Sequence, residues 1–185
     1  MKRIDCYMTP SSPWTYLGHA RFGEIARKHG AQVELKPVDF GVIFPQSGGL
    51  PLGKRAPQRQ AYRLVELKRW REHLGVPLVL QPKFFPVDAG PAACLIAAAP
   101  EAKRMALAGD LLAALWKDDR NLADTSLLEE LGKKHGVAAG DKARFEAFTQ
   151  EALGRGVFGA PSYVYRDEIF WGQDRLEFLD RALKQ

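Results

Sequence analysis

The chain has 185 residues, of which 46% are hydrophobic and 26% charged, which predicts a soluble globular protein with one core and room for a second lobe. Its net charge of +5 at pH 7 suits either nucleic acid or a small anionic substrate, but the basic residues are scattered, which argues against a nucleic-acid-binding face. Only two cysteines, Cys6 and Cys94, are present, and no apolar run is long enough to span a membrane. We therefore expect a cytoplasmic protein without disulfide bonds or a metal site.

The most informative stretch joins a predicted strand to a predicted helix near the N-terminus. Polar and apolar residues alternate over 3–8, and apolar residues then recur at helical spacing from Trp14 to Gly30. Between them, Ser12 occupies the N-cap position and Pro13 the first helical position. Because a helix N-terminus stabilises an anion placed against it, Ser12 is either a simple cap or part of an anion-binding site.

The rest of the chain predicts a second strand, a block of helices and a C-terminal hairpin. The second strand covers 32–38, where Pro37 indicates an edge position or an early end, and 39–57 is predicted to be a long loop rich in Gly and Pro. Helical patterns then cover 57–75, 91–99, 102–117, 126–135 and 141–154. A hairpin of 162–165 and 168–171 follows, with a last helix that starts at Gly172.

The order of these elements predicts the fold class. Strand, helix and strand at the N-terminus form a parallel βαβ unit with a right-handed crossover, and the chain ends in two strands and a helix. We therefore expect an α/β protein of the thioredoxin-like fold with an all-helical insertion. The thioredoxin-like domain would comprise residues 1–45 and 155–185, and the insertion with its connecting loops residues 46–154.

Four motifs occur in order along the chain: Ser-Pro-Trp-Thr-Tyr-Leu at 12–17, Arg-Trp at 69–70 with Gly-Val-Pro at 75–77, Val-Phe-Gly-Ala-Pro-Ser at 157–162 and Trp-Gly-Gln-Asp-Arg-Leu at 171–176. Together they resemble the motifs of the kappa-class glutathione transferase and 2-hydroxychromene-2-carboxylate isomerase family. Each motif alone is weak, but all four occur at matching spacing along the full length. The resemblance is therefore specific.

The resemblance implies that glutathione is the cofactor and that Ser12 is the catalytic residue. In this family the serine donates its hydroxyl to the glutathione sulfur, which favours the thiolate. The family's proline before the third strand is cis, so Ala160 and Pro161 would contact the cysteinyl backbone of the tripeptide. Gln173 would bind the γ-glutamyl carboxylate and Asp174 its ammonium; Asp174 could also be a simple acid at a helix N-terminus.

The substrate half of the site departs from the isomerase pattern. An expected Asn-Arg pair falls on Gly53-Lys54, so Lys54 keeps the charge and is a glutathione-binding candidate, although it could simply face solvent. An expected lysine falls near Phe44, and an expected tyrosine is Phe84. The resemblance places the substrate pocket at Pro13, Trp14, Phe44 and Phe84. These departures leave the substrate open and make a more apolar acceptor compatible with the sequence.

The implied function is a glutathione-dependent isomerase that interconverts 2-hydroxychromene-2-carboxylate and trans-o-hydroxybenzylidenepyruvate. It would act by reversible addition of the thiolate to the conjugated aromatic pyruvate. Two alternatives stay open: a kappa-like glutathione S-transferase and a non-catalytic glutathione- or ligand-binding protein. A disulfide oxidoreductase is excluded, because Ser12 and Thr15 stand where its Cys-x-x-Cys motif would be. As partners we expect a small aromatic substrate and a second copy in a homodimer, but neither nucleic acid nor a membrane.

Overall fold

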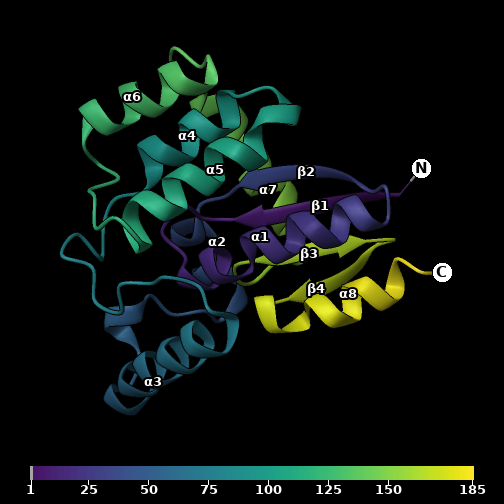
Figure 1. Cartoon of the computed structure of the whole chain (residues 1–185), viewed down its shortest axis with the longest axis horizontal. Coiled ribbons are helices and arrows are strands. Elements are labelled where there is room, and N and C mark those ends of the chain that lie inside the picture. Colours follow the sequence, from purple (N-terminus) through teal and green to yellow (C-terminus); the bar gives the residue numbers. More distant parts are fainter. Residues whose placement is uncertain (1) are drawn as a thin grey trace.

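A four-stranded mixed sheet forms the centre of the structure, a computed structural model that describes residues 2–185 (Figure 1). Its strands, in the spatial order β2-β1-β3-β4, are β1 (Arg3–Met8), β2 (Gln32–Pro37), β3 (Ser162–Tyr165) and β4 (Glu168–Trp171). β1 and β2 are parallel, whereas β3 is antiparallel to both β1 and β4. The predicted βαβ unit and C-terminal hairpin are confirmed, and Pro37 lies in an edge strand, as predicted.

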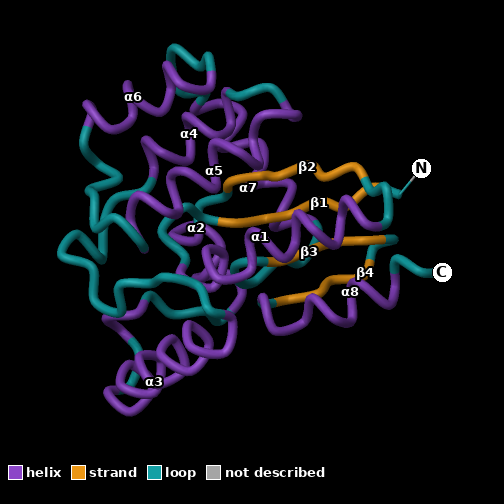
Figure 2. Tube along the Cα trace, in the orientation of Figure 1, coloured by secondary structure: helices purple, strands orange, loops and turns teal. Residues whose placement is uncertain are grey.

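Helices fill most of the chain between β2 and β3 (Figure 2). The helices are α1 (Pro13–Lys28), α2 (Phe40–Ser47), α3 (Pro57–Leu74), α4 (Gly90–Ala98), α5 (Glu101–Trp116), α6 (Thr125–His135), α7 (Lys142–Gly154) and α8 (Leu176–Ala182), with single 3-10 turns η1 (Leu52–Lys54) and η2 (Gln173–Arg175). The predicted α/β fold with a helical insertion is confirmed. The division into two domains stays a prediction, and its first boundary, after residue 45, falls inside α2.

Two sequence expectations were wrong. The segment 39–57 is not a simple loop, because it contains α2 and η1, and the last helix is preceded by η2. Asp39 caps α2 by accepting a hydrogen bond from the Gly41 N–H at 2.7 Å, and Gly48 ends the helix at a φ of 73°. Burial of Phe40 and Ile43 offsets the cost of Pro45 inside this helix.

Each face of the sheet packs against its own set of helices. On one face, Ile4 and Cys6 of β1 pack with Phe22 of α1 and Leu179 of α8 in one apolar cluster. On the opposite face, side chains from β1 and β3 pack against α2 and α7 in a second cluster. Figure 1 shows α1 in front of the sheet and α7 behind it. The sheet is therefore the middle layer. No helix within residues 2–185 is long and apolar enough to cross a membrane.

α1 and η2 pack closely together at Gly18. A Cβ at this position would lie 2.6 Å from the Cβ of Gln173 and 3.1 Å from the Tyr163 hydroxyl. We expect Gly18→Ala to lower the free energy of unfolding by about 1–3 kcal/mol through overpacking. In the matched variant Gly23→Ala, the nearest atom is the Met105 methyl at 3.7 Å, and helix propensity should raise stability by up to about 1 kcal/mol. Urea unfolding of both variants tests this; equal effects would contradict the packing.

An ionic cluster joins the end of α1 to α8. His29 Nε2 and Lys28 Nζ lie 2.8 Å and 2.9 Å from Asp180 Oδ1. Hydrogen bonds from His29 and then Lys28 lower the pKa of Asp180 to about 2. The depressed pKa stabilises the fold above the unfolded-state pKa of about 4, and this stabilisation is lost as pH falls towards 2.

Asp180→Asn should therefore reduce stability at pH 7. Because the Lys28 side chain is largely exposed, we expect a loss of about 1 kcal/mol after solvent screening. The difference from the unsubstituted protein should shrink between pH 4 and pH 2. Urea unfolding measured across this pH range checks the prediction, and a difference independent of pH would refute it.

Candidate active site

The residues predicted to bind glutathione come from segments that meet at one edge of the sheet. Tyr7 of β1 lies opposite Ser162 of β3, and Ser162 lies opposite Trp171 of β4. Because these pairs are antiparallel, the end of β1, the start of β3 and the end of β4 lie at the same edge. The segments that adjoin this edge carry five of the predicted residues: Ser12, Ala160, Pro161, Gln173 and Asp174.

Ser12 is the N-cap of α1, as predicted, and its side chain is only 7% exposed. Its Oγ accepts a hydrogen bond from the Thr15 N–H at 3.1 Å, which satisfies one of the free donors of the first turn. A hydroxyl can also donate its own proton. No acceptor for that proton, and none for the Trp14 N–H, is present among the described residues. The N-terminus of α1 therefore offers two free donors and the positive end of the helix dipole.

The segment before β3 is held against the end of β4. The Ala160–Pro161 peptide bond is cis, as the family resemblance implied. The Pro161 carbonyl accepts a hydrogen bond from the Gly172 N–H at 2.8 Å, and the Ser162 hydroxyl donates to the Gly159 carbonyl at 2.7 Å. The backbone N–H and carbonyl of Ala160 make no hydrogen bond within the described part of the chain. Both groups of Ala160 are therefore free to pair with a peptide-like ligand.

Gln173 and Asp174 lie in η2, not inside the last helix. The side chain of Gln173 is buried, and its Oε1 accepts a hydrogen bond from Arg21 Nη1 at 2.9 Å. Its Nε2 is buried without a partner in residues 2–185. The Asp174 carboxylate is partly exposed and forms an ion pair with Arg175. The contacts of Gln173 and Asp174 with glutathione stay predictions.

Arg21 is a site residue that the sequence analysis missed. It lies in α1 and orients the Gln173 amide across a separation of 152 residues. One local signal was available, since Arg21 is placed at helical spacing from Trp14 and Gly18 on α1. That spacing puts the residue on the same side of α1, but it cannot identify a partner so far away in sequence.

The predicted substrate-pocket residues pack in two places. Pro13 is buried at the start of α1. Trp14 and Phe84 pack against the apolar cluster formed largely by α4, α5 and α6. Phe44 packs, together with Ala160, against the cluster between the sheet and α7. The assignment of these four residues to one pocket stays a prediction.

Lys54, the remaining predicted glutathione contact, is exposed at the end of η1. No ion pair joins it to another described residue. Two surface hollows, of about 420 and 800 Å³, lie between α1 and α8 and beside α4 and α6. Neither hollow is lined by a predicted site residue. The candidate site is instead the convergence of free donors at the sheet edge, since free donors are what a peptide-like anion requires.

Cys6 is the thiol nearest in sequence to Ser12, but its environment does not favour a thiolate. It lies in β1 and is 2% exposed. Burial, followed by the charge of Asp5, raises the pKa of the Cys6 thiol far above its ordinary value. Cys6 is therefore an inert core residue.

The fold is thioredoxin-like, and at the sheet edge a serine caps the first helix. The family model described as the DsbA-like thioredoxin domain matches residues 3–184, and the chain belongs to this family.

Curated relatives match nearly the whole chain. A 2-hydroxychromene-2-carboxylate isomerase of Sphingobium xenophagum is 28% identical over 198 residues, covering 98% of each chain. The isomerase of the same name from Pseudomonas putida is 26% identical and covers 97% of this chain and 93% of its own length. The resemblance to this isomerase family is confirmed.

Solved structures agree on the fold. That of a 2-hydroxychromene-2-carboxylate isomerase has a TM-score of 0.82 at 26% identity, covering 98% of this chain and 94% of its own. The cytosolic disulfide reductase DsbM of Pseudomonas aeruginosa, solved with GSH, has a TM-score of 0.63 at 20% identity, covering 99% and 100%. The likeness to the reductase shows a shared fold only.

Proposed function

We propose that this protein is a glutathione-dependent isomerase of the 2-hydroxychromene-2-carboxylate type that acts on a conjugated aromatic pyruvate. Isomerases of that name match it over nearly its full length, which supports the reaction class. The observation that carries the proposal is the Ser12 hydroxyl, which caps α1 yet keeps a proton without an acceptor among the described residues. A hydroxyl in this position is suited to donate to a sulfur anion.

The residues at the sheet edge fit glutathione. Ser12 and the Trp14 N–H are free donors at the positive end of α1, where a thiolate would be stabilised. Ala160 offers a free N–H and carbonyl, which match the cysteinyl backbone of a tripeptide. Gln173 Nε2 is a buried donor without an acceptor, as expected for a group that pairs with a carboxylate. These residues would hold glutathione, and Lys54 and Asp174 would bind its charged ends.

Bound glutathione would supply a thiolate that can add reversibly to the conjugated double bond, so that the bond can rotate. The chain's own contribution is to bind the sulfur and stabilise its anionic form. Ser12 donates a hydrogen bond to the anion, and the α1 N-terminus adds favourable charge, so the thiol loses its proton nearer neutral pH. The aromatic residues Trp14, Phe44 and Phe84 would enclose the substrate ring and exclude water.

A kappa-like glutathione S-transferase is the second candidate, because Phe84 lacks the hydroxyl that the isomerase pattern expects. The two functions share the glutathione half of the site and differ in what happens to the tripeptide. An isomerase regenerates glutathione, whereas a transferase consumes it in a conjugate.

The test is turnover of trans-o-hydroxybenzylidenepyruvate with glutathione far below the substrate concentration. We expect isomerisation to continue over many turnovers with no loss of free thiol. Conjugation of a chlorinated nitroaromatic with consumption of thiol would favour the transferase instead. Binding of glutathione with neither reaction would leave a non-catalytic binding protein and contradict the proposed function.

We also propose that the protein acts as a homodimer in the cytoplasm. Cys6 and Cys94 are both free thiols in the structure, which suits a reducing compartment. Light scattering coupled to gel filtration measures the oligomeric state directly, and a single monomeric species at working concentration would refute the dimer.

A further inference from the structure

Two buried donors within the helical insertion have no acceptor in the described chain. They are Nη2 of Arg63 in α3 and Nε1 of Trp116 at the end of α5. Trp116 is 0% exposed. The Arg63 guanidinium carbon lies 5.8 Å from the centroid of the Trp116 ring and 5.0 Å from that of Phe85. The two unpaired donors are therefore neighbours, and a buried donor is normally paired with an acceptor.

The charges around Arg63 make an anion the matching acceptor. Arg55, Arg59 and Arg63 follow one another at intervals of four residues, and none of the three forms an ion pair within residues 2–185. Burial and then the charge of Arg55 lower the pKa of Arg63 to about 10, so the guanidinium keeps its proton at neutral pH. Stacking on Phe85 and Trp116 fixes the planar guanidinium, whose fork of N–H groups matches a carboxylate.

This cationic site lies next to the helix that carries the catalytic serine. α3 packs against α1, and the Tyr16 hydroxyl in the first turn of α1 donates to the Pro77 carbonyl just after α3. Phe85 adjoins Phe84 in the chain, and Trp14 packs against the same apolar cluster as Trp116. Figure 1 shows α3 beyond the end of the sheet towards which β1 points. An anion bound here could thus belong to a molecule that also reaches the N-terminus of α1.

We propose that Arg63 and Trp116 form the carboxylate-binding site for an aromatic 2-oxo acid substrate, an inference that rests on the proposed function. Arg63 donates to the carboxylate and compensates its charge, and the Trp116 indole N–H donates a further hydrogen bond. The substrate class is thereby narrowed to acids that carry a carboxylate beside the conjugated carbonyl. A neutral aromatic enone would leave both donors unpaired and bind more weakly.

The test is calorimetric binding of two probes that differ only in the carboxylate: trans-o-hydroxybenzylidenepyruvate and the methyl ketone trans-o-hydroxybenzylideneacetone. S-methylglutathione, whose sulfur cannot form a thiolate, is present throughout, so that binding is measured without turnover. Arg63→Gln should weaken binding of the oxo acid by about 10- to 100-fold and change that of the ketone by less than about twofold. Arg63→Lys should weaken binding of the oxo acid less than Arg63→Gln does, since lysine keeps the positive charge but lacks the paired N–H donors of the guanidinium.

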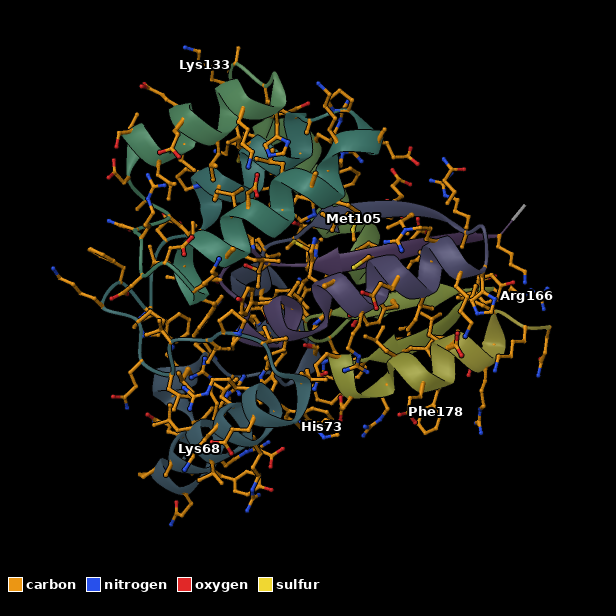
Figure 3. All side chains as sticks on the ribbon, in the orientation of Figure 1. Lys68, His73, Met105, Lys133, Arg166 and Phe178 are labelled. Atoms are coloured by element: carbon orange, nitrogen blue, oxygen red, sulfur yellow. The ribbon has the colours of Figure 1, made fainter. Side chains whose placement is uncertain are left out.

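Two further variants sharpen the result. Trp116→Phe keeps an aromatic ring without the N–H and should weaken oxo acid binding by about 3- to 10-fold. Lys68→Gln removes one charge from an exposed position of α3, labelled in Figure 3, and should leave the binding of both probes unchanged. Unchanged affinity for S-methylglutathione in each variant shows that the fold is intact.

Three results for Arg63→Gln would overturn the inference. They are equally weakened binding of both probes, unchanged binding of the oxo acid, or weakened binding of S-methylglutathione alone. The first would assign the donors to packing or an ordered water, and the last would assign Arg63 to a glutathione carboxylate. Failure of the proposed function is a separate observation, since absence of isomerase turnover in the unsubstituted protein does not affect these binding measurements.

Discussion

Replacing Ser12 by alanine is expected to slow isomerisation at neutral pH by about 10- to 100-fold. The substitution removes a charge-assisted hydrogen bond to the thiolate, worth about 1.5–3 kcal/mol. At about 1.4 kcal/mol per unit, the pKa of the bound thiol should rise by about one to two units. The rate should partly recover at alkaline pH, where the thiolate re-forms. Glutathione affinity should change little, because the free groups of Ala160 and Gln173 remain.

Two matched variants separate the donor role from the capping role. Ser12→Thr keeps both the hydroxyl and the cap, and it should retain most of the activity. Ser11→Ala removes a hydroxyl one residue away that lies 3.2 Å from Thr9 Oγ1, and it should leave the rate unchanged. Loss of the cap in Ser12→Ala should cost about 1 kcal/mol of stability whatever the chemistry. A similar rate loss in Ser11→Ala would contradict a specific role for Ser12.

Lys36→Met is expected to lower the free energy of unfolding by about 3–5 kcal/mol. Lys36 is 3% exposed, and its Nζ lies 2.6 Å from Glu151 Oε1, 3.1 Å from Asp5 Oδ1 and 3.3 Å from Glu34 Oε2. Without the ammonium, these carboxylates would repel one another beneath α7. The cluster ties β1 and β2 to α7, and Glu151 also accepts a hydrogen bond from the Tyr7 hydroxyl.

The same cluster has a definite pH dependence. Burial lowers the pKa of Lys36, but hydrogen bonds to Glu151 and Asp5 outweigh it, so the net pKa is raised. The stabilisation is therefore fully present below the unfolded-state pKa of about 10.4 and is lost as pH rises through the folded-state pKa.

The control for Lys36→Met is Lys142→Met, at an exposed lysine 3.6 Å from Glu146, which should change stability by less than about 0.5 kcal/mol. Equal losses in the two variants by urea unfolding would contradict the account.

The strands and most helices were predictable because their patterns are local. Alternation along β1 and the Ser-Pro start of α1 identified both elements. The helix α2 was missed because Pro45 and the nearby glycines indicated a loop, although Asp39 and Gly48 are ordinary capping residues. In the alternation of β2, Lys36 falls on the same face as the polar residues Gln32 and Glu34. The structure buries Lys36 against α7, and no local pattern in β2 could show this.

The parts of the candidate site that depend on local sequence alone were predictable. Ser12 follows from its position before proline at a strand-to-helix junction, and its N-cap geometry is confirmed. The contact between Arg21 and Gln173 depends on tertiary packing, as does the contact between Arg63 and Trp116. On a helix as basic as α3, sequence alone cannot distinguish a half-buried arginine from an exposed lysine such as Lys68.

The pKa of the bound glutathione thiol, followed by the ultraviolet absorbance of the thiolate, tests the central role of Ser12 most directly. In the unsubstituted protein, the pKa of the bound thiol should lie below the value of about 8.5 for a free cysteine thiol. In Ser12→Ala the pKa of the bound thiol should rise by about one to two units, whereas Ser11→Ala should give the same titration curve as the unsubstituted protein. Superimposable curves for all three proteins, with only a lowered melting temperature in Ser12→Ala, would show that Ser12 is a helix cap and nothing more.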